Sequence, residues 1–246
     1  MRIHATHGTR LDAGMLDVSR IRSGDAAAAG SAAHTRRNLM SAPRRALIVV
    51  DVQNDYFDAE GPLAIQYPPR DESVANIVRV LDAAQQAGVP TAVVQHQYPE
   101  GFPVFAEGSE GQKLHADVES RSHDGWKRAT KSVASVFPET DLAEWLKENG
   151  VDTITLVGYM TNNCILGTAA DAEPMGVAVE VLSDSTGAVN LTNAQGSVPA
   201  QQVHETLMTL LNSNFAAVSD TATWLRALES GDPIEGSNLP ASATGA

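Results

Sequence analysis

Short, fully apolar runs alternate along this chain with amphipathic segments of helical period. Residues 46–50 (ALIVV) form the first such run and end at Asp51. From Ser73, apolar residues recur three and four positions apart until Gly88, and the next apolar run covers residues 91–94. Apolar runs of this length are typical of strands buried on both faces, and the segments between them have the period of covering helices. The pattern therefore predicts a parallel sheet with helices on both sides, an α/β fold in three layers.

The alternation continues through the second half of the chain. Asp141 to Asn149 is a predicted helix, with Thr140 as its N-cap and Gly150 as its stop. A helix is also expected from about Cys164 to residue 174. The remaining expected elements are strands at 153–157, 177–182 and 215–218, a helix at 200–212 and a short helix around Trp224.

Both ends of the chain have a different composition. Residues 1–42 are rich in Ala, Gly, Ser, Arg and His and have no sustained period, and residues 230–246 are similar. Such segments cannot bury enough apolar surface to order themselves, so both are predicted to be disordered and dispensable. One domain, residues 43–229, remains as the predicted folded body.

Charge and hydropathy exclude several classes of function. The chain has 17 Lys and Arg against 30 Asp and Glu, a net charge of -13, which disfavours a nucleic-acid partner. No run approaches the roughly 18 apolar residues of a membrane span, and the N-terminus lacks the apolar core of a secretory signal. We therefore expect a cytoplasmic protein that binds neither nucleic acid nor membrane.

Functional side chains of a parallel sheet gather where its strands end. The glycine-rich signatures of dinucleotide and ATP sites are missing after every expected strand, so no nucleotide cofactor is expected. The first strand instead ends at Asp51, and the strand at 153–157 leads to the single cysteine, Cys164. A helix start lowers the pKa of a thiol, which favours a reactive Cys164, although a lone cysteine is also commonly a small buried core residue.

Three separate blocks of the sequence resemble the isochorismatase-like cysteine hydrolases, a family that includes the nicotinamidases. These blocks are residues 46–55, residues 131–142 and residues 158–172, and the resemblance covers about residues 44–228. It implies a catalytic triad of Asp51, Lys131 and Cys164. Lys131 fits better than Lys127 because it directly precedes the family's element of Ser135, Phe137, Thr140 and Leu142.

The resemblance also implies a fold and a mechanism. The family sheet has six parallel strands in the order 3-2-1-4-5-6, so one more strand is expected near residues 126–131. The implied reaction is hydrolysis of a small amide, in which Cys164 forms a thioester, Asp51 transfers protons and Lys131 stabilises the anions. The backbone N–H groups of Met160 and Cys164 would bind the oxyanion, and the Tyr159–Met160 peptide would be cis.

One departure from the nicotinamidases bears on metal binding. Those enzymes carry an Asp-x-His element after the second strand, whereas here no aspartate stands two residues before His96. His115 and His123 could join His96 around a metal, but irregularly spaced histidines in a polar loop are more often solvated. No metal and no cofactor are therefore expected.

Substrate choice is expected to lie in the long segments 56–70 and 97–130, because loops at the sheet edge form the pocket. The expected partners are a small-molecule amide and, from the resemblance, further copies of the chain. Two alternatives stay open: a vinyl-ether hydrolase of the isochorismatase type, and a catalytically silent binding protein on the same fold. The candidate substrate contacts are Gln53, Phe57, His96, Tyr98, Trp126 and Tyr159, with Phe102 and Phe105 as further candidate pocket walls.

Overall fold

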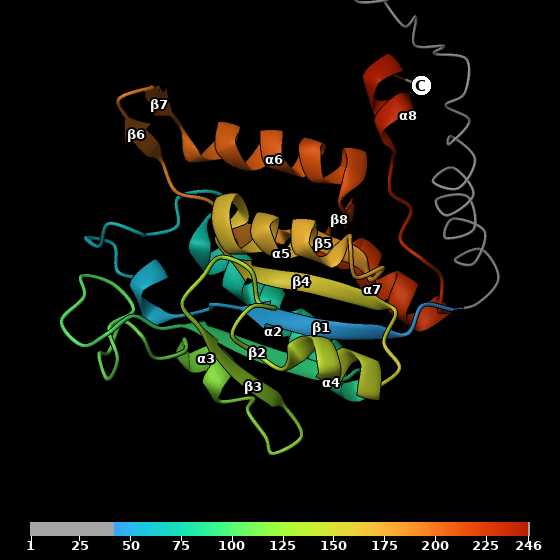
Figure 1. Ribbon diagram of the computed structural model, residues 1–246, viewed down its shortest axis with the longest axis horizontal. Helices are drawn as coiled ribbons and strands as arrows, with labels where there is room; N and C mark the ends of the chain where they lie inside the picture. The colour runs from blue at the N-terminus through green and yellow to red at the C-terminus, as the bar shows by residue number, and fades with distance from the viewer. Residues whose placement is uncertain (1–41, 246) are drawn as a thin grey trace, which may run out of the picture. The chain divides into compact units, whose positions relative to one another are not determined.

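A six-stranded parallel sheet forms the centre of the molecule (Figure 1). The computed structural model describes residues 42–245, so the predicted extension at 1–42 lies outside the described residues except for Ala42. The strand order is β3-β2-β1-β4-β5-β8, and every pairing in this sheet is parallel. This confirms the predicted order, since β8 is the sixth strand of the sheet. The strands are β1 (Arg45–Val50), β2 (Thr91–His96), β3 (Lys127–Lys131), β4 (Thr153–Tyr159), β5 (Ala178–Gly187) and β8 (Ala217–Ser219).

Helices cover both faces of the sheet, as the apolar runs predict. Successive side chains of a strand point to opposite faces. Leu47 and Val49 of β1 thus belong to one apolar cluster, whereas Ala46, Ile48 and Val50 belong to another. The first cluster packs under α2 (Arg70–Gln86), α3 (Ala116–Glu119) and α7 (Thr221–Ser230), and the second under α4 (Leu142–Glu148), α5 (Leu166–Ala172) and α6 (Ala200–Asn214).

Several short elements were not expected from the sequence. An antiparallel hairpin of β6 (Leu191–Asn193) and β7 (Gly196–Val198) follows β5 along the chain and lies beside the start of α6 (Figure 1). A 3-10 turn, η1 (Asn54–Tyr56), follows β1, and α3 interrupts the long segment before β3. In the strand β3, partly buried and exposed side chains alternate before Lys131, so it lacks the continuous apolar run that identifies the other strands.

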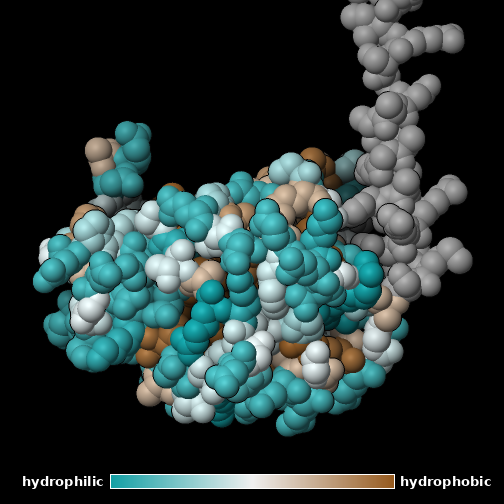
Figure 2. Space-filling view, turned by 60° about the horizontal axis from the view of Figure 1, so that its bottom comes forward, coloured by the Kyte–Doolittle hydropathy of each residue, from teal (hydrophilic) through white to brown (hydrophobic). Residues whose placement is uncertain are grey.

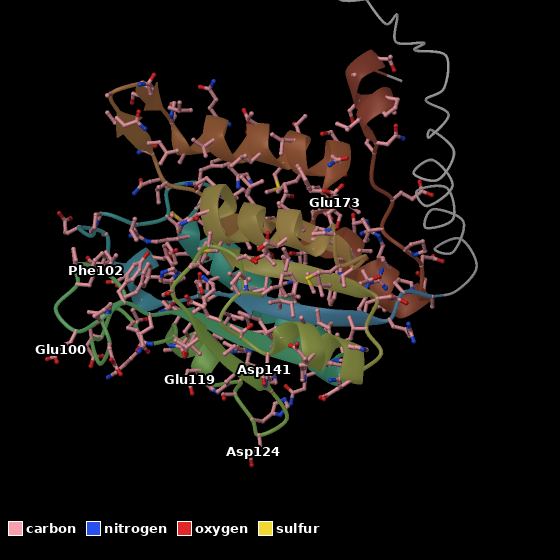
Figure 3. All side chains as sticks on the ribbon, in the orientation of Figure 1. Glu100, Phe102, Glu119, Asp124, Asp141 and Glu173 are labelled. Carbon is pink, nitrogen blue, oxygen red and sulfur yellow. The ribbon has the colours of Figure 1, made fainter. Side chains whose placement is uncertain are left out.

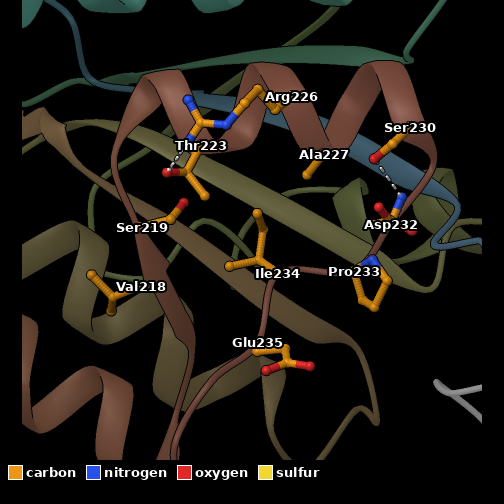
Figure 4. Close-up of a pocket in the computed structure, with 10 residues that line it drawn as sticks. All are labelled: Val218, Ser219, Thr223, Arg226, Ala227, Ser230, Asp232, Pro233, Ile234 and Glu235. Atoms are coloured by element: carbon orange, nitrogen blue, oxygen red, sulfur yellow. Dashed lines mark hydrogen bonds between the residues drawn. The ribbon is translucent and has the colours of Figure 1, made fainter.

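The C-terminal segment differs from the prediction of a disordered tail. Residues after Ser230 run back along the domain and end in α8 (Leu239–Thr244). The Asp232 carbonyl accepts a hydrogen bond from Arg45, and Ile234 packs against the apolar cluster under α7. Ile234 also lines a pocket of about 380 Å³ between β8 and α7, and its side chain is labelled in Figure 4. These contacts, with a hydrogen bond from the Ser237 N–H to the Asn212 carbonyl, hold a segment whose composition alone indicates disorder.

A buried network of charged and polar groups joins the amino-terminal ends of β1, β4 and β5. The Arg45 guanidinium donates to both carboxylate oxygens of Glu180, with its shortest bond at 2.8 Å. Glu180 also accepts from the Thr155 hydroxyl at 2.8 Å and from the Trp224 indole at 3.1 Å. Both charges are therefore paired and hydrogen-bonded, which is the condition under which buried ions are tolerated.

The visible surface is largely polar. Figure 2 shows hydrophilic side chains over most of one face, with hydrophobic atoms in patches between them. Among residues 42–245, the longest helices are too short or too polar to cross a lipid bilayer.

Candidate active site

The carboxyl ends of three strands bring Asp51, Lys131 and Cys164 into contact. Asp51 directly follows β1, Lys131 ends β3, and Cys164 lies in the turn after β4. Lys131 Nζ is 2.7 Å from Asp51 Oδ2 and 3.3 Å from Cys164 Sγ. All three side chains are buried, and only 2% of Lys131 is exposed. The three residues that the resemblance selects thus form one cluster, the triad.

The backbone directs the Asp51 carboxylate into the site. Asp51 has a φ of 51°, in the left-handed region that non-glycine residues seldom adopt, and its N–H bonds the Val94 carbonyl of β2. The neighbouring strand approaches closely at Gly158, whose φ is 107°. A Cβ there would lie 2.0 Å from the carbonyl oxygen of Val50, so only glycine fits beside the end of β1.

Cys164 is carried by η2 (Thr161–Ile165), a π-helical turn that continues into α5. Such turns are rare and occur often at functional sites. The peptide between Tyr159 and Met160, at the entry to this turn, is cis, as the resemblance implies. His204 supports the turn from α6, because its Nδ1 lies 2.9 Å from the Thr161 hydroxyl.

His96 is a fourth side chain in contact with Lys131. Its Nδ1 lies 3.0 Å from Lys131 Nζ, and the two residues are directly paired in the register of β2 and β3. The Gln53 side chain holds the backbone of His96, accepting from its N–H at 2.7 Å and donating to its carbonyl at 2.8 Å. Gln53 also donates to the Gln112 carbonyl at 2.7 Å, so its amide is fully used within the protein. It therefore holds His96 in place, a role different from the predicted substrate contact.

Among residues 42–245, one group of side chains has the spacing of metal ligands, and the ammonium of Lys131 lies between them. That set comprises Asp51, His96 and Cys164, whose ligand atoms lie within 4.8 Å of one another. Lys131 Nζ is within 3.3 Å of all three. His115 and His123 do not join them, since each accepts a hydrogen bond from a nearby backbone N–H. A divalent cation would have to displace Lys131, so the residues do not fit a resident metal.

Burial and neighbouring charges set the proton positions in the site. Burial raises the pKa of Cys164, the Asp51 carboxylate raises it further, and Lys131 opposes both. The expected lowering of this pKa by the helix start is therefore wrong, because it left out the loss of water around the thiol. Burial also raises the pKa of Asp51. For Lys131, burial is outweighed by Asp51 and Cys164 together, so its pKa is raised and it stays charged.

The pKa of His96 shifts in the opposite direction, downwards. Burial and the charge on Lys131 lower the pKa of His96 to about 4, so its imidazole is neutral at physiological pH. Since Lys131 is a donor without an acceptor, His96 Nδ1 accepts from it. The remaining proton of the neutral ring is then on Nε2. This atom is buried and has no hydrogen-bond partner, and the same holds for Asp51 Oδ1.

Aromatic rings connect His96 with the outside of the molecule. The ring of Tyr98 lies 4.5 Å from that of His96 and 4.3 Å from that of Phe102. Phe102 is 48% exposed and lies at the outer edge of the molecule (Figure 3). Phe105 also packs against His96, with the ring centroids 5.6 Å apart. Of the predicted wall residues, Tyr98 and Phe105 therefore lie against His96 beside the triad, and Phe102 packs on Tyr98 farther out.

The other predicted substrate contacts are placed differently. Phe57 is partly buried and packs on Tyr159 and His115. Tyr159 is fully buried, with its hydroxyl 2.6 Å from the Ser73 hydroxyl, and Trp126 belongs to the core under α2. Tyr159 and Trp126 are thus core residues. The contact between His96 and Lys131 was not predicted from the sequence, because it depends on the register between β2 and β3.

Comparison with known proteins gives a consistent result. The family model of the isochorismatase domain matches residues 45–223, a region that includes the sheet and all three residues of the triad. An uncharacterized isochorismatase family protein of Bacillus subtilis, YddQ, is 32% identical over 183 residues, which cover 74% of this chain and 98% of that protein. The nicotinamidase of Escherichia coli is 28% identical, over 61% of this chain and 85% of its own.

A solved structure supports the same relationship. A putative isochorismatase from Burkholderia xenovorans LB400 superposes with a TM-score of 0.80 at 45% sequence identity. The superposition covers 83% of this chain and 97% of that one. The likeness therefore extends over nearly the whole of that protein.

Proposed function

The chain belongs to the isochorismatase family of hydrolases, and from this membership we propose that it hydrolyses the C–N bond of a small amide through a thioester on Cys164. The observation that carries the proposal is the contact of one buried ammonium, Lys131, with both Asp51 and Cys164. A thiol nucleophile, a carboxylate base and a fixed cation are together the groups that amide hydrolysis by covalent catalysis requires. The similarity to a nicotinamidase supports an amide as the substrate.

The reaction starts from the protonated thiol. Asp51 takes the proton of Cys164 as Sγ attacks the carbonyl carbon, so a C–S bond forms while the carbonyl π pair moves onto oxygen. The backbone N–H groups of Met160 and Cys164 are the proposed donors to this oxyanion. Lys131 balances the negative charge, which stays within the site throughout the transfer.

The second half of the reaction releases the amine and regenerates the thiol. Asp51 gives its proton to the departing nitrogen as the C–N bond breaks, because an amide anion is a very poor leaving group. Water then loses a proton to Asp51 and attacks the thioester carbon. The C–S bond breaks, the carboxylic acid leaves, and Cys164 recovers its proton from Asp51.

The test compares the unmodified protein with Cys164→Ala and with protein alkylated by iodoacetamide. Both changes are expected to abolish turnover of primary amides and N-carbamoyl compounds. Hydroxylamine added to the unmodified protein should intercept the thioester and yield a hydroxamate. Exposed Thr192→Ala on the β6 and β7 hairpin serves as the matched control and should retain full activity.

Other outcomes would contradict the proposal in distinct ways. Amide turnover that survives loss of the thiol would refute the covalent mechanism. Isochorismate turnover by the unmodified protein and by Cys164→Ala alike would support the vinyl-ether alternative. A silent binding protein would show no turnover of any compound in any form.

A further inference from the structure

An unsatisfied hydrogen-bond donor lies beside the triad. His96 is only 4% exposed, and its Nε2 has no hydrogen-bond partner in the described part of the chain. Leaving a buried donor without a partner costs about 1 to 3 kcal/mol, so such a group in a rigid site calls for an explanation. The triad does not use this atom, since the contact of His96 with Lys131 is made through Nδ1.

The orientation of this donor is fixed from three sides. Gln53 clamps the backbone of His96 through its N–H and its carbonyl. Lys131 holds Nδ1 and thereby determines which nitrogen carries the proton. The rings of Tyr98 and Phe105 pack against the imidazole at 4.5 and 5.6 Å. His96 therefore presents an immobile Nε2–H donor in an aromatic environment.

The charges of the site indicate which acceptor this donor takes. The charge of Lys131 is balanced by Asp51, and His96 is neutral, so the four groups have no net charge. Among residues 42–245, no other lysine or arginine forms an ion pair with Asp51. A carboxylate on the substrate would thus enter a dry site without a counter-ion, which is costly. An uncharged acceptor, such as a carbonyl oxygen or a ring nitrogen, meets no such penalty.

We propose that His96 Nε2–H is a substrate-recognition donor, and that the site selects uncharged amides that carry a second hydrogen-bond acceptor besides the scissile carbonyl. The rings of Tyr98 and Phe105, which pack on His96, provide the apolar wall beside that acceptor. This inference rests on the proposed function, because it names the class of amide that the same site takes. It also disfavours isochorismate, which carries two carboxylates.

The test uses pairs of amides that are matched in size and shape and differ in the second acceptor. Benzamide is compared with the three pyridinecarboxamides, and 3-methylbutanamide with malonamide, in the presence of a chelator. Malonamate, which carries a carboxylate in place of the second amide, probes the role of charge. In the unmodified protein, the best acceptor-bearing amide should exceed its partner by roughly 10- to 100-fold in kcat/KM. Malonamate should be the poorest substrate of its series.

Two variants of His96 separate recognition from support of Lys131. In His96→Asn, the side-chain oxygen can still accept from Lys131, but nothing replaces the Nε2 donor. The preference for the second acceptor should therefore disappear, mainly through a higher KM for the acceptor-bearing amides. In His96→Gln, the longer side chain places an N–H near the former Nε2, and part of the preference should return. Equal preferences in the unmodified protein and His96→Asn would overturn the inference.

Two readouts do not depend on turnover. Long-range ¹H–¹⁵N spectra at neutral pH should show His96 protonated at Nε2, and a proton on Nδ1 would overturn the inference. Affinities measured on Cys164→Ala should favour the acceptor-bearing member of each pair, and equal affinities would also overturn it. If no amide is hydrolysed but these two results hold, the proposed function fails while the recognition by His96 stands.

Discussion

Cys164 is the residue whose protonation decides how the site works. A thiolate prepared in advance would need a surrounding that favours negative charge, but burial and the adjacent Asp51 carboxylate both raise the pKa of this thiol. Lys131 lowers it only in part. In the proposed mechanism the thiol is therefore activated during attack, by proton transfer to Asp51, and this makes Asp51 as necessary as the nucleophile.

The two roles of Asp51 can be separated with Asp51→Asn. Asparagine cannot take the thiol proton, so kcat for amide hydrolysis should fall by about 10²- to 10⁴-fold. Because the carboxylate raises the pKa of Cys164, its removal should lower that pKa while Lys131 stays charged. The thiolate fraction at pH 7 should then increase, and iodoacetamide should alkylate Cys164 faster than in the unmodified protein.

The pH dependence of alkylation, followed by mass spectrometry, checks this prediction. The rate in the unmodified protein should keep rising above about pH 8.5, the ordinary pKa of a thiol, whereas Asp51→Asn should reach its plateau at lower pH. Lys131→Met is the opposing control, since loss of the cation should slow alkylation. Slower alkylation in Asp51→Asn would show that the carboxylate activates the resting thiol.

The triad could be predicted from sequence because each member lies in a separate block of recognisable residues, around Asp51, Lys131 and Cys164. The contact of His96 with Lys131 could not, because it depends on the register between β2 and β3. The effect of burial on the pKa of Cys164 could not be predicted either. A helix start can be identified from the sequence, but the exclusion of water from the thiol depends on segments packed over it from elsewhere in the chain.

At the level of elements, the close approach of β1 and β4 places Asp51 and the turn with Cys164 side by side. Gly158 permits this approach, since a Cβ there would lie 2.0 Å from the Val50 carbonyl oxygen. Gly158→Ala should therefore push the end of β4 away from β1, lower stability by several kcal/mol and reduce activity even in the folded fraction.

Gly88→Ala is the matched control for Gly158→Ala. Gly88 also has a positive φ, of 67°, but a Cβ there would meet no atom within 4 Å. It should lose only about 1 kcal/mol and keep full activity. Urea unfolding and kcat measured on both variants check the prediction. Equal losses in the two variants would mean that positive φ, and not the close approach, is what constrains Gly158.

The elements that the sequence predicts well are the buried ones. The strands β1, β2 and β4 have uninterrupted apolar runs, and α2 and α6 have clear helical periods. By contrast, β3 lies at the edge of the sheet with alternating exposure, and it was expected only from the resemblance. The hairpin of β6 and β7 has mostly exposed residues, so no burial pattern marks it.

For the molecule as a whole, the sheet has a catalytic end and a structural end. The triad lies at the carboxyl ends of the strands, and the pair of Arg45 and Glu180 lies toward their amino ends. Both ends contain buried charges, yet the pair at the amino end has every charged group bonded within the protein, whereas the triad leaves Asp51 Oδ1 free. The ion pair that stabilises the fold and the triad therefore lie at opposite ends of the strands.

Removal of one member of the structural pair should be strongly destabilising. Glu180→Ala leaves the Arg45 guanidinium buried without a counter-ion, and such changes cost about 3 to 5 kcal/mol. The double variant Arg45→Met with Glu180→Leu removes both charges and should recover most of that loss. Chemical unfolding of the three proteins checks the prediction, and a double variant as unstable as Glu180→Ala would contradict it.

The C-terminal segment connects to this structural end, and truncation tests its contribution. Ending the chain after Gly231 removes the Asp232 carbonyl that Arg45 bonds at 2.7 Å, together with Ile234, and should cost about 1 to 3 kcal/mol. Ending it after Ser237 removes only α8, which has no buried residue, and should cost less than about 1 kcal/mol. Because the triad lies at the carboxyl ends of the strands, away from this segment, kcat should be unchanged in both truncated proteins. A fall in kcat after either truncation would show that the two ends of the sheet are coupled. Equal stability of the two truncated proteins would mean that residues 232–237 contribute nothing to the stability of the fold.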